Sequence, residues 1–389
     1  MNGWHVFCGL QIIMKLAVPK ETKSKENRVA MTPEVVLGLI KNGHSCSVEK
    51  GAGFNSFFTD DAYVAAGATI VADKAALYSG ADVVVKVNAP LPDEIAMMAP
   101  GAVLISFMFA AVNPDLVSAC VKRGVSSFSM DAIPRISRAQ KMDALSSQSN
   151  LAGYKAVIIA ANALGKIFPL LMTAAGTIRP SKVLIMGAGV AGLQAVATAK
   201  RLGAVVEVSD IRPETKEQVE SLGGKFIESG GGPVKTEGGY VKEVSDDFLA
   251  KQQQNLANHV KDADIVITTA LIPGKKAPVL LTEDMVKSMR FGSVIVDMAV
   301  EQGGNCVGSE INKTVVKHGV TIIGESNLPS LLPLNASDLY ARNVAAFLAH
   351  LATKDGFKWE MDEEITKGSL ITHKGQAVHP SVSTVNSKV

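Results

Sequence analysis

Short apolar runs alternate with amphipathic stretches along the N-terminal half of the chain. The short segments predicted as strands lie at residues 15–18, 47–49, 82–87, 103–106 and 127–129, and those at 82–87 and 103–106 are apolar runs. The stretches between them have the apolar spacing of helices, and Thr32 followed by Pro33 predicts the start of one helix, with the Thr32 hydroxyl as its cap. Strands that alternate with helices favour parallel pairing, so this half of the sequence predicts a parallel sheet.

A second alternating series follows the first. Its apolar runs lie at residues 183–186, 205–209, 265–269, 294–298 and 320–323. Residues 151–172 are rich in Ala, Leu and Ile and predict a long helix between two domains, and a helix at 338–352 is expected to return the chain to the first domain. We therefore predict an α/β fold of two Rossmann-like, doubly wound parallel-sheet domains joined by long helices, with the first domain discontinuous.

The predicted domain boundaries follow from these two series. The first domain is expected at residues 14–150 with 331–380, the second at 151–330, and a flexible tail at 381–389. Residues 229–260 are rich in Gly, Lys, Glu and Gln and predict a functional loop followed by a polar helix. The apolar segment before Met14 has neither a basic start nor a clear cleavage site, so we expect no signal peptide and a native start at Met14.

The composition excludes several classes of protein. Hydrophobic residues make up 47% and charged residues 20% of the chain, which is typical of compact folded domains. The 39 Lys and Arg residues are balanced by 37 acidic ones without a polybasic block, which argues against a nucleic-acid partner. There is no run of about 18 apolar residues that would span a membrane. The four cysteines are far apart in sequence and show no metal-ligand spacing, so we expect neither a metal site nor a disulfide framework.

A glycine-rich turn, GAGVAG, follows the apolar run at 183–186 and opens a predicted helix that begins at Val190. In such a turn Gly187 permits the sharp bend, Gly189 lets the backbone approach a pyrophosphate, and Gly192 allows the helix to pack closely on the strand. The positive end of the helix faces the phosphate charge. This strand, turn and helix predict a dinucleotide site.

An acidic residue stands where the next predicted strand ends. Asp210 has the spacing from the turn that is expected of a carboxylate binding the adenosine ribose, with Ile211 beside it as a further contact. A carboxylate there would repel a 2′-phosphate and favours NAD(H) over NADP(H). Arg212 could meet a phosphate, but a solvated arginine on a loop is the commoner situation.

Residues 134–150, PRISRAQKMDALSSQSN, carry a resemblance to a known family. The chain resembles the NAD(H)-binding subunits of proton-translocating nicotinamide nucleotide transhydrogenases, from Met14 to about Pro380. The resemblance implies that Arg135, Gln140, Asp143 and Ser146 hold the nicotinamide and its ribose, that Gln140 also faces the second nucleotide, and that Arg138 contacts the dinucleotide. These side chains can orient a carboxamide without acid-base chemistry, and orientation is what hydride transfer chiefly needs.

The resemblance extends to other segments of the second domain. Gly238-Gly239-Tyr240 resembles a mobile loop in which the tyrosine folds over the bound nucleotide, with the glycines as a hinge. Ala270, Leu271 and Asn327 follow predicted strand ends, where ligands of open α/β folds bind, although simple loop packing is an equal alternative for them.

The family implies that NADH bound on this chain transfers a hydride directly to NADP+ on a partner domain, without a protein nucleophile or a metal. It also implies NADP(H)-binding and transmembrane subunits that couple the transfer to proton translocation. The chain itself would be a homodimer, cytoplasmic and peripheral to the inner membrane through its partners.

Alanine dehydrogenase, a soluble NAD-dependent relative, is the main alternative. Arg28 and Lys86 stand where that family binds its substrate, but oxidative deamination needs a proton-transfer group, and its histidine is replaced by Phe109. Glu301 stands where the relative has a second catalytic acid, and we interpret it as structural here. A non-enzymatic NAD(H)-binding module is a third possibility, against which the polar loop from Arg135 to Ser146 argues.

Overall fold

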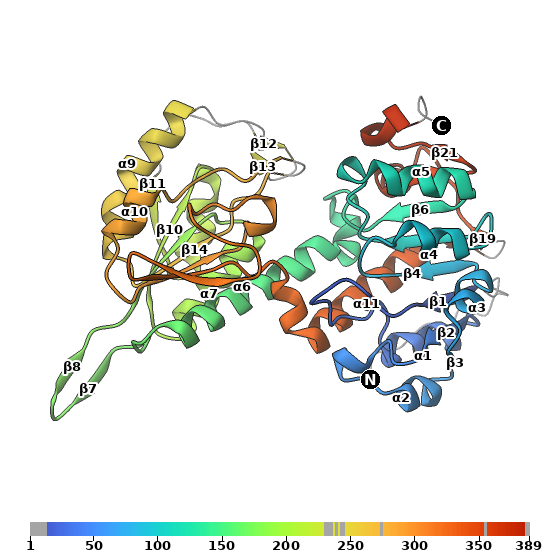
Figure 1. Ribbon diagram of the computed structural model, residues 1–389, viewed down its shortest axis with the longest axis horizontal. Helices are drawn as coiled ribbons and strands as arrows, with labels where there is room; N and C mark the ends of the chain where they lie inside the picture. Colours follow the sequence, from blue (N-terminus) through green and yellow to red (C-terminus); the bar gives the residue numbers. More distant parts are fainter. Residues whose placement is uncertain are drawn as a thin grey trace. The chain divides into compact units, whose positions relative to one another are not determined.

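The computed structural model describes residues 14–228, 236–237, 240–241, 246–272, 275–353 and 356–385. Within these residues the chain divides into two compact units. Unit 1 lies within Met1–Gln148 and Leu332–Val389, and unit 2 is formed from Ser149–Leu331 (Figure 1). The described helices include none that is long and apolar enough to cross a membrane.

Unit 1 is built on an eight-stranded sheet in the order β21-β20-β6-β5-β4-β1-β2-β3. The strands from β1 to β6 pair in parallel, whereas β20 is antiparallel to both β6 and β21. The C-terminal segment therefore adds an antiparallel edge that the sequence pattern did not predict. The strands are β1 Lys15–Val18, β2 Ser45–Glu49, β3 Thr69–Val71, β4 Val83–Val85, β5 Val103–Ser106, β6 Ser126–Ser129, β20 Leu370–His373 and β21 Gln376–Ala377.

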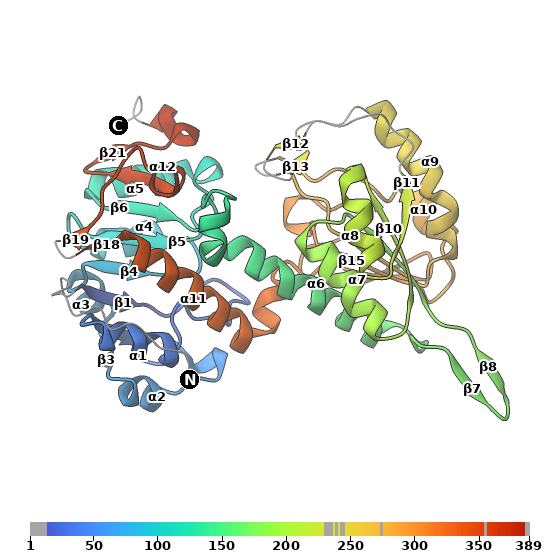
Figure 2. The ribbon, with the colours of Figure 1, turned by 180° about the vertical axis from the view of Figure 1, so that it is seen from behind.

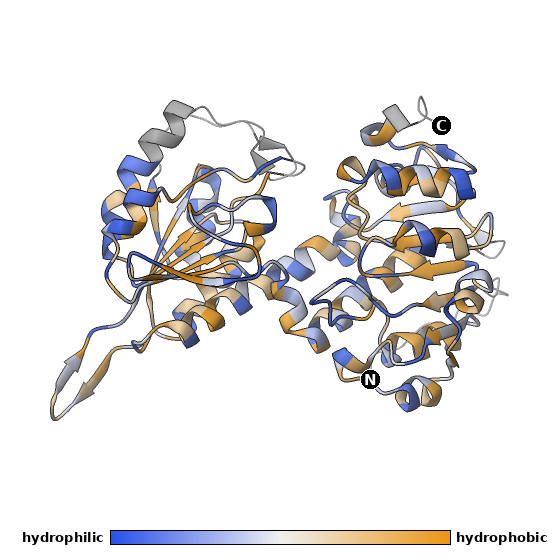
Figure 3. Ribbon diagram, viewed as in Figure 1, coloured by the Kyte–Doolittle hydropathy of each residue, from blue (hydrophilic) through white to orange (hydrophobic). Residues whose placement is uncertain are grey.

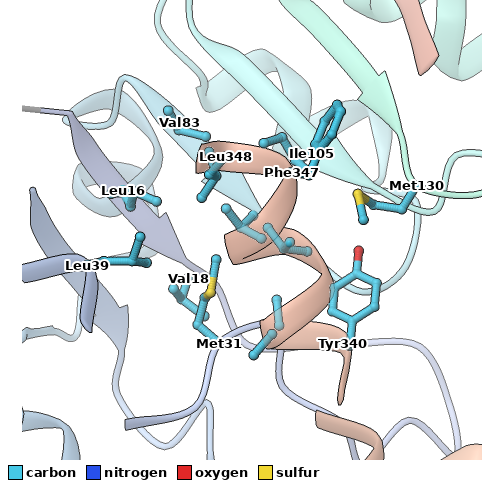
Figure 4. Close-up of a cluster of buried hydrophobic side chains, with 14 of the residues drawn as sticks. Leu16, Val18, Met31, Leu39, Val83, Ile105, Met130, Tyr340, Phe347 and Leu348 are labelled. Atoms are coloured by element: carbon cyan, nitrogen blue, oxygen red, sulfur yellow. The ribbon is translucent and has the colours of Figure 1, made fainter. Parts of the chain in front are cut away.

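Alternate residues of the parallel strands pack in two separate hydrophobic cores in unit 1. Leu16 and Val18 pack with α1 and α11 on one face (Figures 2 and 4). Ala17 packs with α3, α4 and α5 on the other face. Burial on both faces explains why β1, β4 and β5 are nearly continuous apolar runs. The helices are α1 Pro33–Lys41, α2 Asp60–Ala65, α3 Lys74–Ser79, α4 Pro92–Met97, α5 Pro114–Arg123, α11 Pro333–Leu351 and α12 Glu364–Ser369.

Unit 2 has a seven-stranded sheet in the order β11-β10-β9-β14-β15-β17-β16, parallel except for β16 at one edge. Helices α6, α7 and α8 pack on one face, and α9 and α10 on the other. The predicted fold class is thereby confirmed. The elements are β9 Lys182–Met186, α7 Val190–Arg201, β10 Val205–Asp210, α8 Lys216–Ser221, β11 Lys225–Glu228, α9 Asp246–Asp262, β14 Ile265–Thr268, α10 Glu283–Ser288, β15 Val294–Asp297, β16 Thr314–Lys317 and β17 Val320–Ile323.

The long helix predicted at 151–172 is wrong at both ends. Helix α6 runs from Ala144–Ala163, because Asp143 accepts a hydrogen bond from the Ser146 N–H and so caps the helix earlier in the sequence. Gly165 and Pro169 follow its end, residues 164–170 are irregular, and the last two residues of the predicted helix begin an antiparallel hairpin of β7 Leu171–Thr173 and β8 Gly176–Ile178. This hairpin extends from unit 2 as an arm (Figure 1) and carries apolar positions (Figure 3).

Two smaller predictions also need correction. Helix α1 begins at Pro33 as expected, but the Thr32 hydroxyl makes no capping bond to it. Helix α11 begins at Pro333, five residues before the predicted start at 338, with the proline in its first turn. Pro380–Val385 forms a 3₁₀ turn whose Val382 is buried in the core of unit 1, and the flexibility expected of the tail at 381–389 stays a prediction.

Candidate functional site

The glycine turn joins β9 to α7 in unit 2. Gly187 has φ +111°, a conformation that favours glycine, and its N–H donates to the Ser209 carbonyl at 2.8 Å. A Cβ at Gly187 would collide with the Thr269 hydroxyl, and a Cβ at Gly192 would collide with the Gly187 carbonyl oxygen. Both glycines are therefore required by packing around the turn.

Gly189 differs from these two glycines. It has a φ of −74°, and a Cβ at this position would meet nothing within 4 Å. The protein's own packing would therefore tolerate a side chain at Gly189. Because glycine has none, a ligand can reach the backbone just before Val190, where α7 begins. Unpaired N–H groups of a first helical turn attract anions, so the turn fits a pyrophosphate.

Asp210 ends β10 next to this turn, and its side chain is buried. One carboxylate oxygen accepts the Ala188 N–H at 2.6 Å, and the Arg212 guanidinium donates to the same oxygen at 2.8 Å. The Arg212 N–H donates to the other oxygen at 2.8 Å. Arg212 is therefore not the solvated loop residue that the sequence suggested. Ile211 lies between the two, half-buried.

The loop after β14 lies against the glycine turn. The Thr269 hydroxyl is 3.2 Å from the Gly187 carbonyl oxygen, and it is followed by Ala270, half-buried, and by Leu271, which is 37% exposed. Asn305 holds Ala270 by two hydrogen bonds. Sequence reasoning missed Asn305, because an isolated asparagine after a predicted turn carries no motif.

The remaining candidates of unit 2 are less closely defined. Asn327 lies after β17, and its N–H donates to a Glu325 carboxylate oxygen at 3.2 Å. Gly239 lies outside the described residues, and Tyr240 is described only as backbone in the short strand β13 Tyr240–Val241. Their expected role in a loop over the nucleotide stays a prediction.

The polar loop of unit 1 contains a 3₁₀ helix, η3, at Ser137–Met142. Its Ala139 and Met142 are buried, whereas Gln140 is exposed, as is Arg135 just before the helix. Asn343 of α11 donates to the Lys141 carbonyl at 2.9 Å and fixes the loop to the core. The buried anchors thus leave the candidate side chains turned toward solvent.

Asp143 and Ser146 are brought together at the end of this loop. Asp143 accepts the Ser146 N–H at 2.9 Å with one oxygen and the Ser146 hydroxyl at 2.6 Å with the other. Arg138 is drawn away from them, because its guanidinium pairs with Glu363 at 3.0 Å and Glu364 at 3.5 Å near the start of α12. The four predicted nicotinamide contacts therefore lie on one loop and the start of α6. Arg138 fixes this loop through its ion pairs with Glu363 and Glu364.

The residues that suggested an amino-acid substrate site are buried in ion pairs. The Arg28 Nη2 lies 2.7 Å from Glu26, and the Lys86 Nζ is 3.0 Å from Glu94. Burial raises the pKa of Glu26, but its bonds to Arg28 outweigh this and lower the pKa to about 2. Both cations are neutralised by the protein's own carboxylates. Glu301 is exposed in a 3₁₀ turn of unit 2.

Phe109 follows β5 in unit 1 and is 49% exposed. It has φ +45°, a strained conformation for a residue with a side chain, and its ring stacks on Phe107 at a centroid distance of 6.0 Å. The Phe109 N–H donates to the Asp131 carboxylate at 3.0 Å, which fixes the turn. The phenyl ring of Phe109 has no group that can donate or accept a proton, so this residue cannot transfer one.

No group of three or more His, Cys, Asp and Glu side chains suited to a metal ion occurs among the described residues.

Comparisons with known proteins cover both units. The profile "Alanine dehydrogenase/PNT, N-terminal domain" matches residues 17–152, and "Alanine dehydrogenase/PNT, C-terminal domain" matches residues 156–380. The chain is 51% identical over 380 residues to an NAD(P) transhydrogenase alpha subunit of Rhodospirillum rubrum, covering 95% of this chain and 99% of that protein. It is 33% identical over 378 residues to alanine dehydrogenase of Bacillus subtilis, covering 95% and 94%.

A solved structure is similar along nearly the whole chain. The transhydrogenase from Sinorhizobium meliloti aligns with a TM-score of 0.83 and 43% sequence identity, covering 94% of this chain and 99% of that one. The similarity in sequence and the similarity in fold therefore each extend over nearly the whole chain.

Proposed function

Since the chain belongs to the alanine dehydrogenase/PNT family, we propose that it is the NAD(H)-binding component of a proton-translocating NAD(P)+ transhydrogenase. The observation that carries this choice within the family is Phe109, an aromatic ring where amino-acid oxidation would need a proton-transfer group. Hydride exchange between two nicotinamides needs no such group. The identity of 51% to a transhydrogenase subunit, against 33% to an alanine dehydrogenase, supports the same choice.

NAD(H) is the substrate proposed for the glycine turn of unit 2. The open backbone at Gly189 gives the pyrophosphate its place at the start of α7, and the Asp210 carboxylate accepts hydrogen bonds from ribose hydroxyls. Arg212 pairs with Asp210, so this guanidinium is occupied by the carboxylate and does not offer a site for a 2′-phosphate. The pair thus favours NAD(H) over NADP(H).

Replacing Asp210 by serine is expected to reverse this preference. Loss of the carboxylate removes the repulsion of a 2′-phosphate and frees the Arg212 guanidinium to bind it. The ratio of NADPH to NADH dissociation constants should fall by about 100-fold, equal to about 2.7 kcal/mol. Nucleotide fluorescence titrations measure both constants. Arg212→Ala serves as the control and should gain no NADPH affinity; an unchanged ratio in Asp210→Ser would rule out the role of Asp210.

The loop of unit 1 is proposed to orient the nicotinamide. Arg135 and Gln140 are exposed, and they supply a hydrogen-bond-donating guanidinium and an amide. Asp143 and Ser146 are held together by a hydrogen bond at the start of α6. None of these groups needs to exchange a proton during the reaction. The hydride passes from C4 of the dihydronicotinamide to C4 of the acceptor ring, so NADH becomes NAD+ and NADP+ becomes NADPH. The protein contributes alignment and exclusion of water.

The acceptor nucleotide is proposed to lie on a separate partner domain. A single dinucleotide fingerprint is present in the sequence, and it is assigned to NAD(H). By the family resemblance, NADP(H)-binding and transmembrane subunits complete the enzyme and couple the transfer to proton translocation. This chain would then lie on the cytoplasmic side of the inner membrane, peripheral to it.

We also propose a homodimer whose interface includes the β7–β8 hairpin. Among the described residues this hairpin pairs with no other strand, and it exposes large apolar side chains that a second copy would cover. They are Leu170, Leu171, Met172 and Ile178.

Introducing a charge into the hairpin is expected to weaken the dimer. Met172 is 73% exposed, and Met172→Glu would place a carboxylate in the buried interface of the dimer. The dissociation constant of the dimer should therefore rise by about 100-fold or more. Sedimentation velocity over a concentration series measures this change. Val64→Glu places the same charge at an exposed apolar position of unit 1 and should leave the dimer intact. A dimer unaffected by Met172→Glu would remove the hairpin from the interface.

The purified chain, assayed first alone and then with an NADP(H)-binding partner, tests the choice between the three functions. We expect it to bind NADH and to produce no NADH from NAD+ and L-alanine, because Arg28 and Lys86 are already paired and Phe109 cannot accept a proton. L-Alanine-dependent reduction of NAD+ would identify an alanine dehydrogenase. NADH binding without hydride transfer to any partner-bound NADP+ would identify a non-enzymatic module.

A further inference from the structure

A fully buried carboxylate lies at the end of β15 in unit 2. Asp297 accepts hydrogen bonds from the N–H groups of Ala299 at 3.0 Å, Asn305 at 3.2 Å and Cys306 at 3.1 Å. The Thr268 hydroxyl is a fourth donor at 3.3 Å. A buried charge is costly unless hydrogen bonds compensate it, so these four donors fix the backbone around Asp297.

Asn305 connects the backbone fixed by Asp297 to the loop after β14. Its side chain is fully buried, and its Oδ1 accepts the Ala270 N–H at 3.1 Å. Its Nδ2 donates to the carbonyl oxygens of Ala270 at 2.9 Å and Pro278 at 2.8 Å. The amide therefore pairs with both backbone polar groups of Ala270, as a neighbouring strand would, although Ala270 lies beyond the end of the sheet.

The residue before Ala270 touches the glycine turn. The Thr269 hydroxyl lies 3.2 Å from the Gly187 carbonyl oxygen and 3.3 Å from that of Met186, and a Cβ at Gly187 would strike this hydroxyl. A shift of the loop by a fraction of an ångström would thus either press on the turn or open it. Asp297, Asn305, Ala270, Thr269 and Gly187 form one continuous series of contacts.

The segment before Asn305 is shaped for this arrangement. Gly304 has φ +81°, which favours glycine, and a Cβ there would lie 2.7 Å from the Asp297 Oδ2. The backbone can therefore pass close enough to the carboxylate for the Asn305 N–H to reach it.

We propose that Asn305 is a positioning residue for dinucleotide binding, which sets the loop of Thr269, Ala270 and Leu271 at the distance from the glycine turn that the nucleotide requires. The proposal rests on the proposed NAD(H) function of this turn. Both hydrogen-bonding groups of the amide converge on Ala270 and not on a helix or strand of the core. Asn305 therefore sets the position of the loop beside the glycine turn more than it stabilises the sheet.

Substitution of Asn305 tests this role. Asn305→Ala releases Ala270, and Asn305→Asp keeps the volume but turns a carboxylate toward two carbonyl oxygens. For either variant we expect the dissociation constant of NADH, measured by fluorescence titration of the folded chain, to rise by about tenfold. In the complex with its NADP(H)-binding partner, the KM for NADH should rise similarly while kcat at saturating NADH stays unchanged.

Ser293→Ala is the matched control. Ser293 is buried just before β15, at the opposite end of the strand, and donates to the Ala263 carbonyl at 3.3 Å. The substitution removes a buried hydrogen bond from the same region of the core and should leave the KM for NADH unchanged. Circular dichroism melting of all variants measures the stability that each one loses.

The outcomes separate the inference from the function on which it rests. A raised KM in either Asn305 variant, with Ser293→Ala unaffected, supports the positioning role. Wild-type affinity in a folded Asn305 variant, or an equal loss in Ser293→Ala, overturns it while the wild-type chain still binds NADH. A wild-type chain that does not bind NADH would instead overturn the proposed function.

Discussion

Replacing Gly192 by alanine is expected to abolish NADH binding at concentrations up to about 100 times the wild-type dissociation constant. The added Cβ would collide with the Gly187 carbonyl oxygen, so α7 has to move away from the turn that it supports. Overpacking of this kind also costs about 1–3 kcal/mol of stability. Fluorescence titration with NADH and thermal unfolding measure the two effects.

Two further glycines make this experiment selective. Gly165→Ala introduces a Cβ that meets nothing within 4 Å in the same unit, and it should leave both the affinity and the melting temperature unchanged. Gly189→Ala also meets no protein atom, so it should leave stability unchanged but weaken NADH binding by at least about tenfold, because only the nucleotide needs that space. NADH binding of wild-type strength by Gly192→Ala would remove the glycine turn from the site.

Shortening Gln140 to asparagine is expected to slow hydride transfer by about 100-fold, because a misplacement of about 1 Å in an orienting group can cost that much. Gln140 is exposed on η3 and does not belong to the core, so the NADH dissociation constant should change by less than about threefold. Stopped-flow measurement of a single turnover with the NADP(H)-binding partner separates transfer from binding.

Lys141→Gln is the control for this loop, since Lys141 is exposed on the same 3₁₀ helix and its carbonyl, which the substitution leaves in place, is held by Asn343. It should transfer hydride at the wild-type rate. If Gln140→Asn were equally fast, the nicotinamide would be oriented by other residues, and the role inferred for this loop from the family resemblance would be wrong.

The order of strands and helices could be predicted because both sheets are parallel and buried on two faces. Apolar runs such as those of β9 and β14 then stand out from the amphipathic helices between them. The edge strands β3, β11, β16 and β21 were not predicted, because a short, partly exposed strand at an edge has no such run. Strand β20, which lies between β21 and β6, was also not predicted. The first hairpin residues, Leu171 and Met172, were included in the predicted helix, since leucine and methionine favour helices and only tertiary structure decides otherwise.

The candidate site shows the same division. Gly187, Gly189 and Gly192 follow from a local motif with fixed spacing, and the family resemblance is confirmed by the comparisons. The Arg212 pairing with Asp210, the Arg138 pairing with Glu363, and the Asn305 contact with Ala270 could not be predicted. Each depends on side-chain geometry or on residues far apart in the sequence, and neither composition nor periodicity carries that information.

The most direct test of the central claim is hydride transfer from NADH to an NADP+ analogue whose reduced form has a distinct absorbance, with and without the NADP(H)-binding partner. We expect no transfer by this chain alone, because its one dinucleotide fingerprint is assigned to NAD(H), and rapid transfer once the partner is added. Transfer that is equally fast without the partner, or absent with it, would contradict the claim that this chain presents NADH to a second nucleotide held elsewhere.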